Sequence, residues 1–456
     1  MKILITGATG LVGTKLVETL ILQGHDDIRI LSTNKKRASK SIPFPVDIKK
    51  WNPLNSEIEE NSLDDVDIIF HLAGESVADG RWSQERKERI LKSRTLGTQI
   101  LLNEIRKSNT TPTKFISSSA VGIYGNTHDR LITTESKLGE GFLAEVCKQW
   151  EGNLYEHNID GMIAHVMRTG IVLSLDGGAL TKMLPPFKMG AGGRLGSGKQ
   201  YMSWIHIDDL VNAFIYLMEN ECRSFAYNGV APTPVTNTEF TKVLGRVLKR
   251  PTISPVPSFM LKLLFGEMSD ILLEGQNVVP NNLIKDGLKF KFEKLDDALE
   301  NILQFDNKGE VQFKRYQWVN ESTDKVFSFF SEAKNLESIT PSYLNFKIEA
   351  MSTAKIEAGS LIDYKLKIHG FPAKWKSKIS KFEEGKSFID EQVSGPYKKW
   401  VHQHDFTPIK NGTLISDTIV YKVPLGSVGN IFAGWFIRRD VNSIFNFRNK
   451  VIKETF

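Results

Sequence analysis

The strongest constraint on the fold lies at the start of the chain, where a short apolar run (KILIT) leads into a glycine-rich turn and then into an amphipathic segment. The run predicts a buried strand, and residues 11–23 predict a helix. The turn between them reads GATGLVG. Gly7 permits a tight turn, Gly10 lets the backbone approach a diphosphate, and Gly13 lets the helix pack closely on the strand. Because the first N–H groups of a helix attract anions, the pattern predicts a dinucleotide site.

The end of the next strand, predicted at residues 28–32, indicates which dinucleotide is bound. Sites for NAD usually place an acidic residue here to bind the ribose 2′-hydroxyl. This chain instead reads LSTNKKR over residues 31–37, without an acid and with three cations. The hydroxyls of Ser32 and Thr33 and the charges of Lys36 and Arg37 suit a 2′-phosphate. We therefore predict NADP(H) as the preferred cofactor, with NAD(H) possible; a basic surface loop is the alternative interpretation.

The pattern of apolar segments divides the chain into three parts. Residues 1–230 alternate strand and helix, which predicts a Rossmann-type, doubly wound parallel sheet in the α/β class. Residues 231–304 lose this alternation, and prolines interrupt helical runs, so we expect a helical lobe on the substrate side. A linker is expected at residues 305–309. Residues 311–456 read as antiparallel strands with two short helices near the start and a long helix at the end, predicting a separate α+β domain.

Composition limits the class of protein. Apolar residues make up 41% of the 456 residues, and no apolar stretch is long enough to span a membrane. The cysteines Cys147 and Cys222 form no disulfide framework or metal-binding spacing, which favours a reducing, cytoplasmic location. Residues 310–456 carry 22 basic and 16 acidic side chains, which accounts for the whole net charge of +6. The lysines are scattered singly, so we expect a solvated surface and no nucleic-acid partner.

Residues 1–300 resemble the extended short-chain dehydrogenases/reductases, in the epimerase-like branch related to cell-division inhibitors. The strings that carry this resemblance are GATGLVG (7–13), HLAGES (71–76), SRTLGT (93–98), SSSAVGIYG (117–125), MRTGIVLS (167–174), GAGGRLGSGKQYMSWIHIDDL (190–210), NGVAPTPVTNTEF (228–240) and LLEGQNVVP (272–280). Beyond the residues already named, the resemblance implies cofactor contacts from Thr9, Leu11, Val12, Leu72, Ala73, Gly74, Glu75, Arg94, Ser117 and Arg168.

The chain departs from that superfamily at the catalytic pair. Active members use Tyr-x-x-x-Lys, in which the tyrosine is the general acid/base and the lysine lowers its pKa. Ser119 matches the accompanying serine, but the Tyr and Lys positions fall on Leu143 and Cys147. Our hypothesis is that Ser119 and Tyr124 are the catalytic residues and that Arg168 orients a substrate anion. A purely structural Tyr124 is the alternative.

Residues 311–456 resemble the START-like (SRPBCC) ligand-binding superfamily, on the strings VFSFFSEAKNLESITP (326–341), GSLIDYKLKIHGFPAKWKSKI (359–379), DEQVSGPYKKWVHQHDF (390–406) and GTLISDTIVYKVPLG (412–426). The resemblance implies a helix-grip fold with an apolar cavity. A terminal helix from about residue 428 to 453 has an apolar face that includes Phe432 and Trp435. Whether Trp375, Tyr397, Trp400 and Phe406 line the cavity or form ordinary core is left open.

Two possible metal-ligand groups are interpreted as structural. His402 and His404 alternate along one strand and so face the same side, but no third ligand is visible nearby, since Asp405 faces the other way. We expect hydrogen-bonded core histidines there. His206, Asp208 and Asp209 are expected at a strand-to-helix junction, where an Asp caps a helix beginning at Leu210. The sequence therefore predicts no metal site.

These observations predict an NADP(H)-binding oxidoreductase or epimerase-like enzyme that acts on a small molecule and carries a domain for a hydrophobic ligand. The missing Tyr/Lys pair leaves open a second class, a catalytically silent NADP(H)-binding redox sensor or ligand-binding protein. The substrate, the ligand and the oligomeric state are not determined by the sequence.

Overall fold

The computed structural model describes residues 1–157, 159–424 and 426–456, and it gives the side chains of 426–435 no description. The chain divides into two compact units. One contains residues 1–42 and 46–303, and the other contains residues 43–45 and 304–456. Within the described residues, no helix combines the length and the apolar character that crossing a membrane requires.

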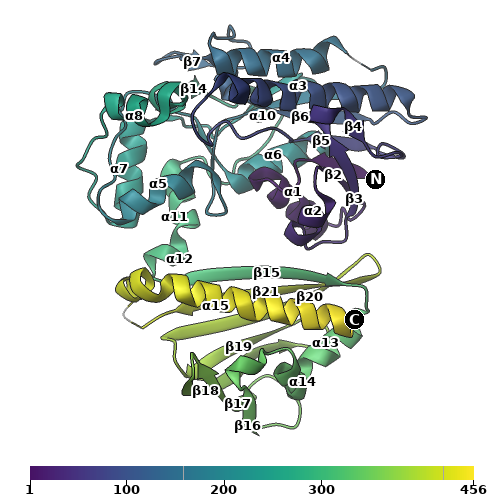
Figure 1. Cartoon of the computed structure of the whole chain (residues 1–456), viewed down its shortest axis with the longest axis vertical. Helices are drawn as coiled ribbons and strands as arrows, with labels where there is room; N and C mark the ends of the chain where they lie inside the picture. Colours follow the sequence, from purple (N-terminus) through teal and green to yellow (C-terminus); the bar gives the residue numbers. More distant parts are fainter. Residues whose placement is uncertain (158, 425) are drawn as a thin grey trace. The chain divides into compact units, whose positions relative to one another are not determined.

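An eight-stranded sheet forms the centre of the N-terminal unit (Figure 1), in the order β12-β8-β6-β5-β1-β2-β3-β4. All neighbouring strands are parallel except the short edge strand β4, which is antiparallel to β3. The strands are β1 (Ile3–Thr6), β2 (Ile28–Ser32), β3 (Asp47–Asn52), β4 (Glu57–Ile58), β5 (Ile68–His71), β6 (Lys114–Ala120), β8 (Ile163–Thr169) and β12 (Ala226–Gly229). This sheet confirms the predicted Rossmann-like architecture of the N-terminal part.

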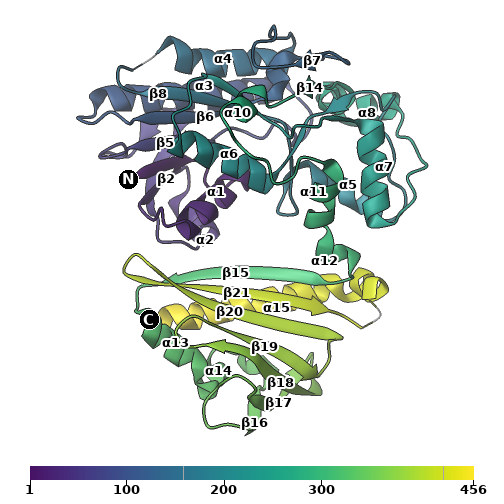
Figure 2. The same cartoon turned by 180° about the vertical axis from the view of Figure 1, so that it is seen from behind.

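Helices cover both faces of this sheet (Figures 1 and 2). The helices α1 (Leu11–Leu22) and α6 (Ile207–Glu219) pack together on one face, and α3 (Gln84–Lys107) and α4 (Phe142–Glu156) pack together on the other. The strands β1 and β5 are buried along their whole length, as a sheet covered on both faces requires. The carboxyl ends of β2, β1, β5, β6 and β8 therefore meet along one edge.

A smaller set of elements continues the N-terminal unit after β12. Its helices are α7 (Asn237–Leu248), α8 (Ser258–Phe265), α10 (Asn281–Lys285) and α11 (Leu295–Ile302). Of these, α7 and α11 enclose, together with α5 (Gly178–Lys188), a core that includes Leu180, Phe240 and Leu299. The carboxylate of Asp209 on α6 accepts the backbone N–H groups of Lys291 and Phe292 at 2.8 and 2.9 Å. It thereby holds the loop before α11.

One local expectation was wrong, and another is only partly matched. The helix α6 begins at Ile207, and His206 caps it by accepting the N–H of Asp208 on Nδ1, so no Asp caps a helix that starts at Leu210. The expected linker at 305–309 overlaps a short helix, α12 (Gln304–Asn307).

Among its described residues, the C-terminal unit has a seven-stranded antiparallel sheet, the short helix α12 before it, and further helices after the first and the last strand. The sheet has the order β15-β21-β20-β19-β18-β17-β16. The strand that comes first in the chain, β15, therefore pairs with the strand that comes last, β21. Its elements are β15 (Val311–Val319), α13 (Thr323–Ser331), α14 (Ala333–Ser338), β16 (Lys347–Met351), β17 (Leu361–Ile368), β18 (Phe371–Glu383), β19 (Ser387–Ser394), β20 (Lys399–Ile409), β21 (Gly412–Lys422) and α15 (Gly426–Thr455).

The long helix α15 lies against this sheet (Figure 1), and its buried residues Val441, Phe445 and Ile452 face the core. Phe327 and Phe330 of α13 pack with aromatic residues of β19 and β20. Phe432 and Trp435, expected on the apolar face of the terminal helix, lie outside the described side chains.

Candidate cofactor and active site

The turn after β1 has the close packing that its three glycines predicted. Gly7 adopts φ of +70°, and a Cβ on it would lie 2.7 Å from the backbone of Leu72. A Cβ on Gly13 would collide with the carbonyl oxygen of Gly7. A Cβ on Gly10 would meet only that same oxygen, at 3.3 Å, so this position is not closed by the protein itself. The surface beside Gly10, at the first turn of α1, is therefore able to accept a diphosphate.

The segment that follows β5 lies next to this turn. Thr6 joins the two strands, because its Oγ1 lies 2.7 Å from Nδ1 of His71 and accepts the N–H of Ala73 at 3.2 Å. A Cβ on Gly74 would lie 3.1 Å from the guanidinium carbon of Arg94 on α3. Glu75 donates its N–H to Ser93 and pairs with Arg86 at 3.0 Å. The predicted residues 72–75 and Arg94 are thus brought together beside the glycine turn.

His71 is a fully buried imidazole at the end of β5. Burial, with a smaller contribution from Arg94, lowers its pKa to about 3, so the ring stays neutral. The rings of Trp51, Phe115 and Trp150 surround it edge to face. Among the residues described, Nε2 of this ring has no hydrogen-bond partner.

The end of β2 presents the predicted basic segment to solvent. The helix α2 (Lys35–Ser41) starts here, and Asn34 caps it by accepting the N–H of Arg37. Lys35 pairs with Glu59 at 3.1 Å. Lys36 and Arg37 are exposed and have no carboxylate partner in the described parts of the chain. Two uncompensated cations therefore stand where an NAD site usually has an acid.

A buried hydrogen-bond network occupies the ends of β6 and β8. Ser119 donates to Oε1 of Glu151 at 2.6 Å, and Arg168 binds the same carboxylate through Nε and Nη2 at 2.9 and 2.7 Å. Nη1 of Arg168 donates to the hydroxyl of Tyr124 at 2.8 Å, and this hydroxyl donates to Asn228 at 2.7 Å. Each of these five side chains is less than 10% exposed.

The charges in this network hold each other in place. Burial by itself would lower the pKa of Arg168, but the hydrogen bonds and charge of Glu151 raise it above its ordinary value. Burial raises the pKa of Tyr124, which keeps the phenol protonated. Four of the five N–H groups of Arg168 are bound to Glu151, Tyr124 and the carbonyl of Thr134. The guanidinium is therefore engaged within the protein rather than directed at a substrate anion.

The helix α4 carries the two positions where the usual catalytic pair would stand. The Cβ of Leu143 packs against Gly122, at the turn that ends with Tyr124. Cys147 is buried beside Ser119, and burial, aided by Glu151, raises its pKa to about 11. A neutral thiol and an isobutyl group occupy this face, so neither supplies a proton relay or a fixed positive charge near neutral pH.

The predicted site residues thus fall into three groups along one edge of the sheet. The glycine turn with Thr9, Leu11 and Val12 meets the 72–75 segment and Arg94; Ser32, Thr33, Lys36 and Arg37 lie at the end of β2; and Ser117, Ser119, Tyr124 and Arg168 lie at the ends of β6 and β8. Sequence reasoning missed the roles of Glu151 and Asn228. The spacing of Leu143, Cys147 and Glu151, each four residues apart on one helix face, could have identified Glu151.

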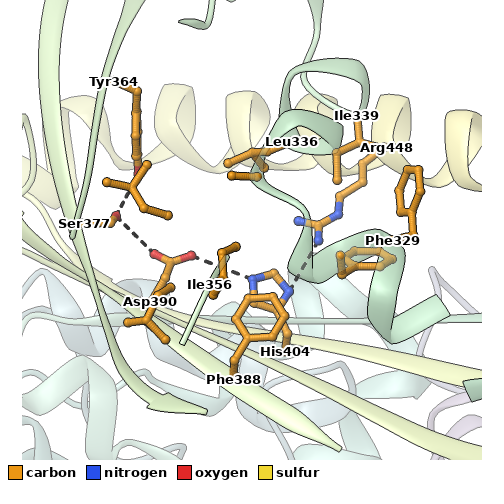
Figure 3. Close-up of a pocket in the computed structure, with 14 residues that line it drawn as sticks. Phe329, Leu336, Ile339, Ile356, Tyr364, Ser377, Phe388, Asp390, His404 and Arg448 are labelled. Carbon is orange, nitrogen blue, oxygen red and sulfur yellow. Dashed lines mark hydrogen bonds and ion pairs between the residues drawn. The ribbon is translucent and has the colours of Figure 1, made fainter. Parts of the chain in front are cut away.

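The C-terminal unit holds a second candidate site, a cavity of about 50 Å³ between its sheet and helices. Figure 3 shows Phe329, Leu336 and Ile356 on its apolar walls, and Asp390, His404 and Arg448 as its polar groups. Trp375, Tyr397, Trp400 and Phe406 do not line this cavity: Trp375 and Phe406 are buried, and Tyr397 and Trp400 pack partly buried against a neighbouring cluster, which favours the interpretation as core.

Comparisons with known proteins match the N-terminal two thirds of the chain. The sequence profile of the NAD dependent epimerase/dehydratase family matches residues 3–146, and a domain of unknown function, DUF1731, matches residues 256–302. A curated protein of Arabidopsis thaliana, "Epimerase family protein SDR39U1 homolog, chloroplastic", is 39% identical over 313 residues, which make up 67% of this chain and 87% of that protein.

Two further proteins extend this similarity. The epimerase family protein Mb2239 of Mycobacterium bovis is 38% identical over 296 residues, covering 65% of this chain and 95% of that protein. The solved structure of human epimerase family protein SDR39U1 with NADPH is 31% identical, with a TM-score of 0.60, and covers 67% of this chain and 99% of that one.

Proposed function

This chain belongs to the epimerase family, and from that premise we propose that it is an NADP(H)-dependent oxidoreductase or epimerase-like enzyme acting on a small molecule. The observation that carries the proposal is the glycine turn open at Gly10, next to a strand end where Lys36 and Arg37 have no acidic partner among the described residues. The NADPH bound to the human relative supports the same choice of cofactor. We further propose domain limits of 1–230, 231–304 and 311–456 and a cytoplasmic location, which suits two free, buried cysteines.

The residues present fit a dinucleotide phosphate. Residues 7–13 would hold the diphosphate, Lys36 and Arg37 with the hydroxyls of Ser32 and Thr33 would hold the 2′-phosphate, and residues 72–75 with Arg94 would lie along the cofactor. When bound, the nicotinamide would supply or accept a hydride.

We propose that Ser119 is the catalytic residue and that Glu151 and Arg168 position it. Ser119 Oγ holds a proton in its hydrogen bond to Glu151, whose carboxylate is fixed by two bonds from Arg168. Tyr124 completes this arrangement through Arg168, so it acts on the reaction through the position of Glu151. A serine hydroxyl that turns from Glu151 to a substrate carbonyl oxygen would hydrogen-bond the oxygen on which charge develops during hydride transfer, and water would supply the proton that this oxygen finally takes up.

The second candidate function is a redox sensor that binds NADP(H) without turnover. Leu143 and Cys147 favour it, since the usual acid/base and its charged partner are replaced by an alkyl group and a neutral thiol.

For the C-terminal unit we propose a START-like, helix-grip ligand domain. Its strand order, with the first strand beside the last, and its long terminal helix against the sheet support this proposal. The cavity of about 50 Å³ is smaller than the ~150 Å³ cavity that accommodates benzene. A ligand that fits this cavity without a rearrangement of the protein is therefore smaller than benzene.

The proposal is tested first by calorimetry of NADPH and NADH with the intact chain and with Gly10→Ala. We expect NADPH to bind more tightly than NADH. We expect Gly10→Ala to lose dinucleotide binding but to unfold at the same temperature as the wild type, because the added Cβ meets only the carbonyl oxygen of Gly7, at 3.3 Å. Deuterated NADPH is then incubated with a panel of carbonyl and enone compounds.

Label in a product that disappears with Ser119→Ala establishes the enzyme. Binding without label on any compound favours the sensor. If neither dinucleotide binds at millimolar concentration, the assignment of residues 7–13 is wrong.

A further inference from the structure

Four polar side chains from three neighbouring strands converge inside the C-terminal unit. Asp390 on β19 stands opposite His402 on β20, and Asp417 on β21 stands opposite His404. His402, His404 and Asp417 are each less than 10% exposed, and the side chain of Asp390 is 22% exposed. Sequence reasoning looked for a third ligand beside the histidines and missed Asp390, because strand pairing brings it there.

Asp417 contacts one nitrogen of each imidazole. Its Oδ1 is 3.0 Å from Nε2 of His402 and 2.8 Å from Nδ1 of His404. A carboxylate only accepts hydrogen bonds, so Nε2 of His402 donates to Asp417, and in the neutral ring Nδ1 of His402 then carries a lone pair. Nδ1 of His404 lies between this carboxylate and the guanidinium of Arg448, and Nε2 is the nitrogen of His404 that faces away from both.

The second nitrogen of each imidazole faces one oxygen of Asp390. Oδ2 of Asp390 lies 3.7 Å from Nδ1 of His402 and 3.7 Å from Nε2 of His404, too far for a hydrogen bond. Each of the three side chains therefore offers one possible ligand atom, and these atoms lie within 4.8 Å of one another.

Neighbouring side chains contact these possible ligand groups and hold their positions. Ser377 contacts the other oxygen of Asp390 at 3.5 Å and is itself 2.8 Å from the hydroxyl of Tyr364, as Figure 3 shows. Arg448 lies 3.6 Å from Oδ1 of Asp417 and balances its charge. Its Nη2 also lies within hydrogen-bond distance of Nδ1 of His404, at 3.3 Å. Two carboxylates and one guanidinium leave this cluster with a net charge of −1, one positive charge short of neutrality.

We propose that Asp390, His402 and His404 form a binding site for a divalent first-row transition metal ion of the zinc or ferrous class. Asp417 contacts the other nitrogen of both imidazoles, the arrangement that orients histidine ligands in metal sites. Ligand atoms that share a tetrahedral ion are about 3.3–3.5 Å apart, so small side-chain rotations close the 3.7 Å gaps. Two imidazoles with one carboxylate favour these ions over Mg²⁺ or Ca²⁺.

The cavity gives the ion an open coordination position. Asp390 and His404 both line the cavity, whose volume of about 50 Å³ accommodates a water or a small ligand atom on the metal. An exogenous group that enters among Phe329, Leu336 and Ile356 would meet the ion at the polar end (Figure 3). The site is built entirely from the C-terminal unit and does not depend on the dinucleotide.

The test uses the full chain, made without a histidine tag and freed of metal with a chelator. Co²⁺ is added under nitrogen as a spectroscopic probe, followed by Zn²⁺, Fe²⁺ and Mg²⁺ in separate competition experiments, and metal content is measured by mass spectrometry. We expect one equivalent of Co²⁺ with visible absorption typical of nitrogen and oxygen ligands, displaced by Zn²⁺ or Fe²⁺ but not by Mg²⁺.

Two variants each remove one proposed ligand, a third changes the carboxylate that contacts both imidazoles, and a fourth is the control. Asp390→Asn and His402→Gln should weaken Co²⁺ binding more than about tenfold, and Asp417→Asn should weaken it by roughly 10–100-fold. His369→Gln should bind normally, since His369 is an exposed histidine of the same unit, paired with Asp440 at 2.8 Å.

Near-ultraviolet circular dichroism checks that each variant is folded. If a ligand variant does not fold, the wild-type Co²⁺ spectrum and stoichiometry still decide. Failure of the wild type to take up Co²⁺, unchanged binding by folded Asp390→Asn, or equal loss in His369→Gln would each overturn the proposal.

Discussion

The buried ion pair between Glu151 and Arg168 should be a large contributor to the stability of the N-terminal unit. Nη2 of Arg168 lies 2.7 Å from Oε2 of Glu151, and both side chains are 7% exposed. We expect Glu151→Gln, which preserves shape and removes the charge, to lower the free energy of unfolding by about 3–5 kcal/mol, because it leaves a buried guanidinium without a counter-charge.

The chain provides a matched control on its surface. Nζ of Lys107 lies 2.6 Å from Oε1 of Glu104, nearly the same separation, but the two side chains are 71% and 30% exposed. Glu104→Gln should therefore cost less than about 1 kcal/mol, because water screens the pair. The difference between the two substitutions isolates the effect of burial.

The assay must distinguish the two units, because a two-domain chain need not unfold in one step. Hydrogen exchange followed by mass spectrometry, on peptides from β8 at increasing urea, reports the opening free energy of the strand that carries Arg168. The double variant Glu151→Leu/Arg168→Met should cost about 2–3 kcal/mol less than the sum of the single substitutions. If Glu151→Gln costs no more than Glu104→Gln, the network is not a desolvated pair, and its proposed role in positioning Ser119 fails with it.

Two further predictions concern the same unit. Since the pKa of His71 is about 3 in the folded chain and about 6.5 when unfolded, the unfolded state binds more protons between these values and stability falls as pH decreases. Between pH 6 and 4, the free energy of unfolding of the wild type, measured by urea titration, should fall by up to about 1.4 kcal/mol per pH unit more than that of His71→Gln. If the two free energies change with pH in parallel, the prediction is wrong. Lys114 donates to the carbonyls of Leu217, Met218 and Asn220 at the end of α6, so Lys114→Met should cost about 1–2 kcal/mol and speed amide exchange there, whereas Lys107→Met should not.

Local sequence patterns predicted the cofactor side of the molecule well. The strand at 28–32 has the predicted bounds, and the helix after GATGLVG ends one residue early, at Leu22. These features depend mostly on neighbouring residues, because the positive φ of Gly7 and the close contact of Gly13 with Gly7 both act within a single turn. The N-terminal Rossmann-like sheet and membership of the epimerase family followed from them.

The parts that sequence reasoning missed depend on contacts between distant segments. Glu151 is recognisable as a buried ion only when β8 places Arg168 against α4. Asp390 becomes a partner of the histidines only through the register that pairs it with His402, and a shift of one residue would turn it to the other face. The turn chemistry between β19 and β20 does not determine that register from the sequence alone.

The strand order of the C-terminal unit has a consequence for its synthesis. β15 is made first, but its neighbour in the sheet is β21, and the register joins Val311 to Tyr421 and Val319 to Thr413. The hairpins from β16 to β21 can form as they leave the ribosome, whereas β15 has to wait for nearly the whole unit before it can pair. Until then its polar backbone edge is unpaired, so a nascent chain stalled before β21 would present a ready partner for chaperones or for other nascent chains.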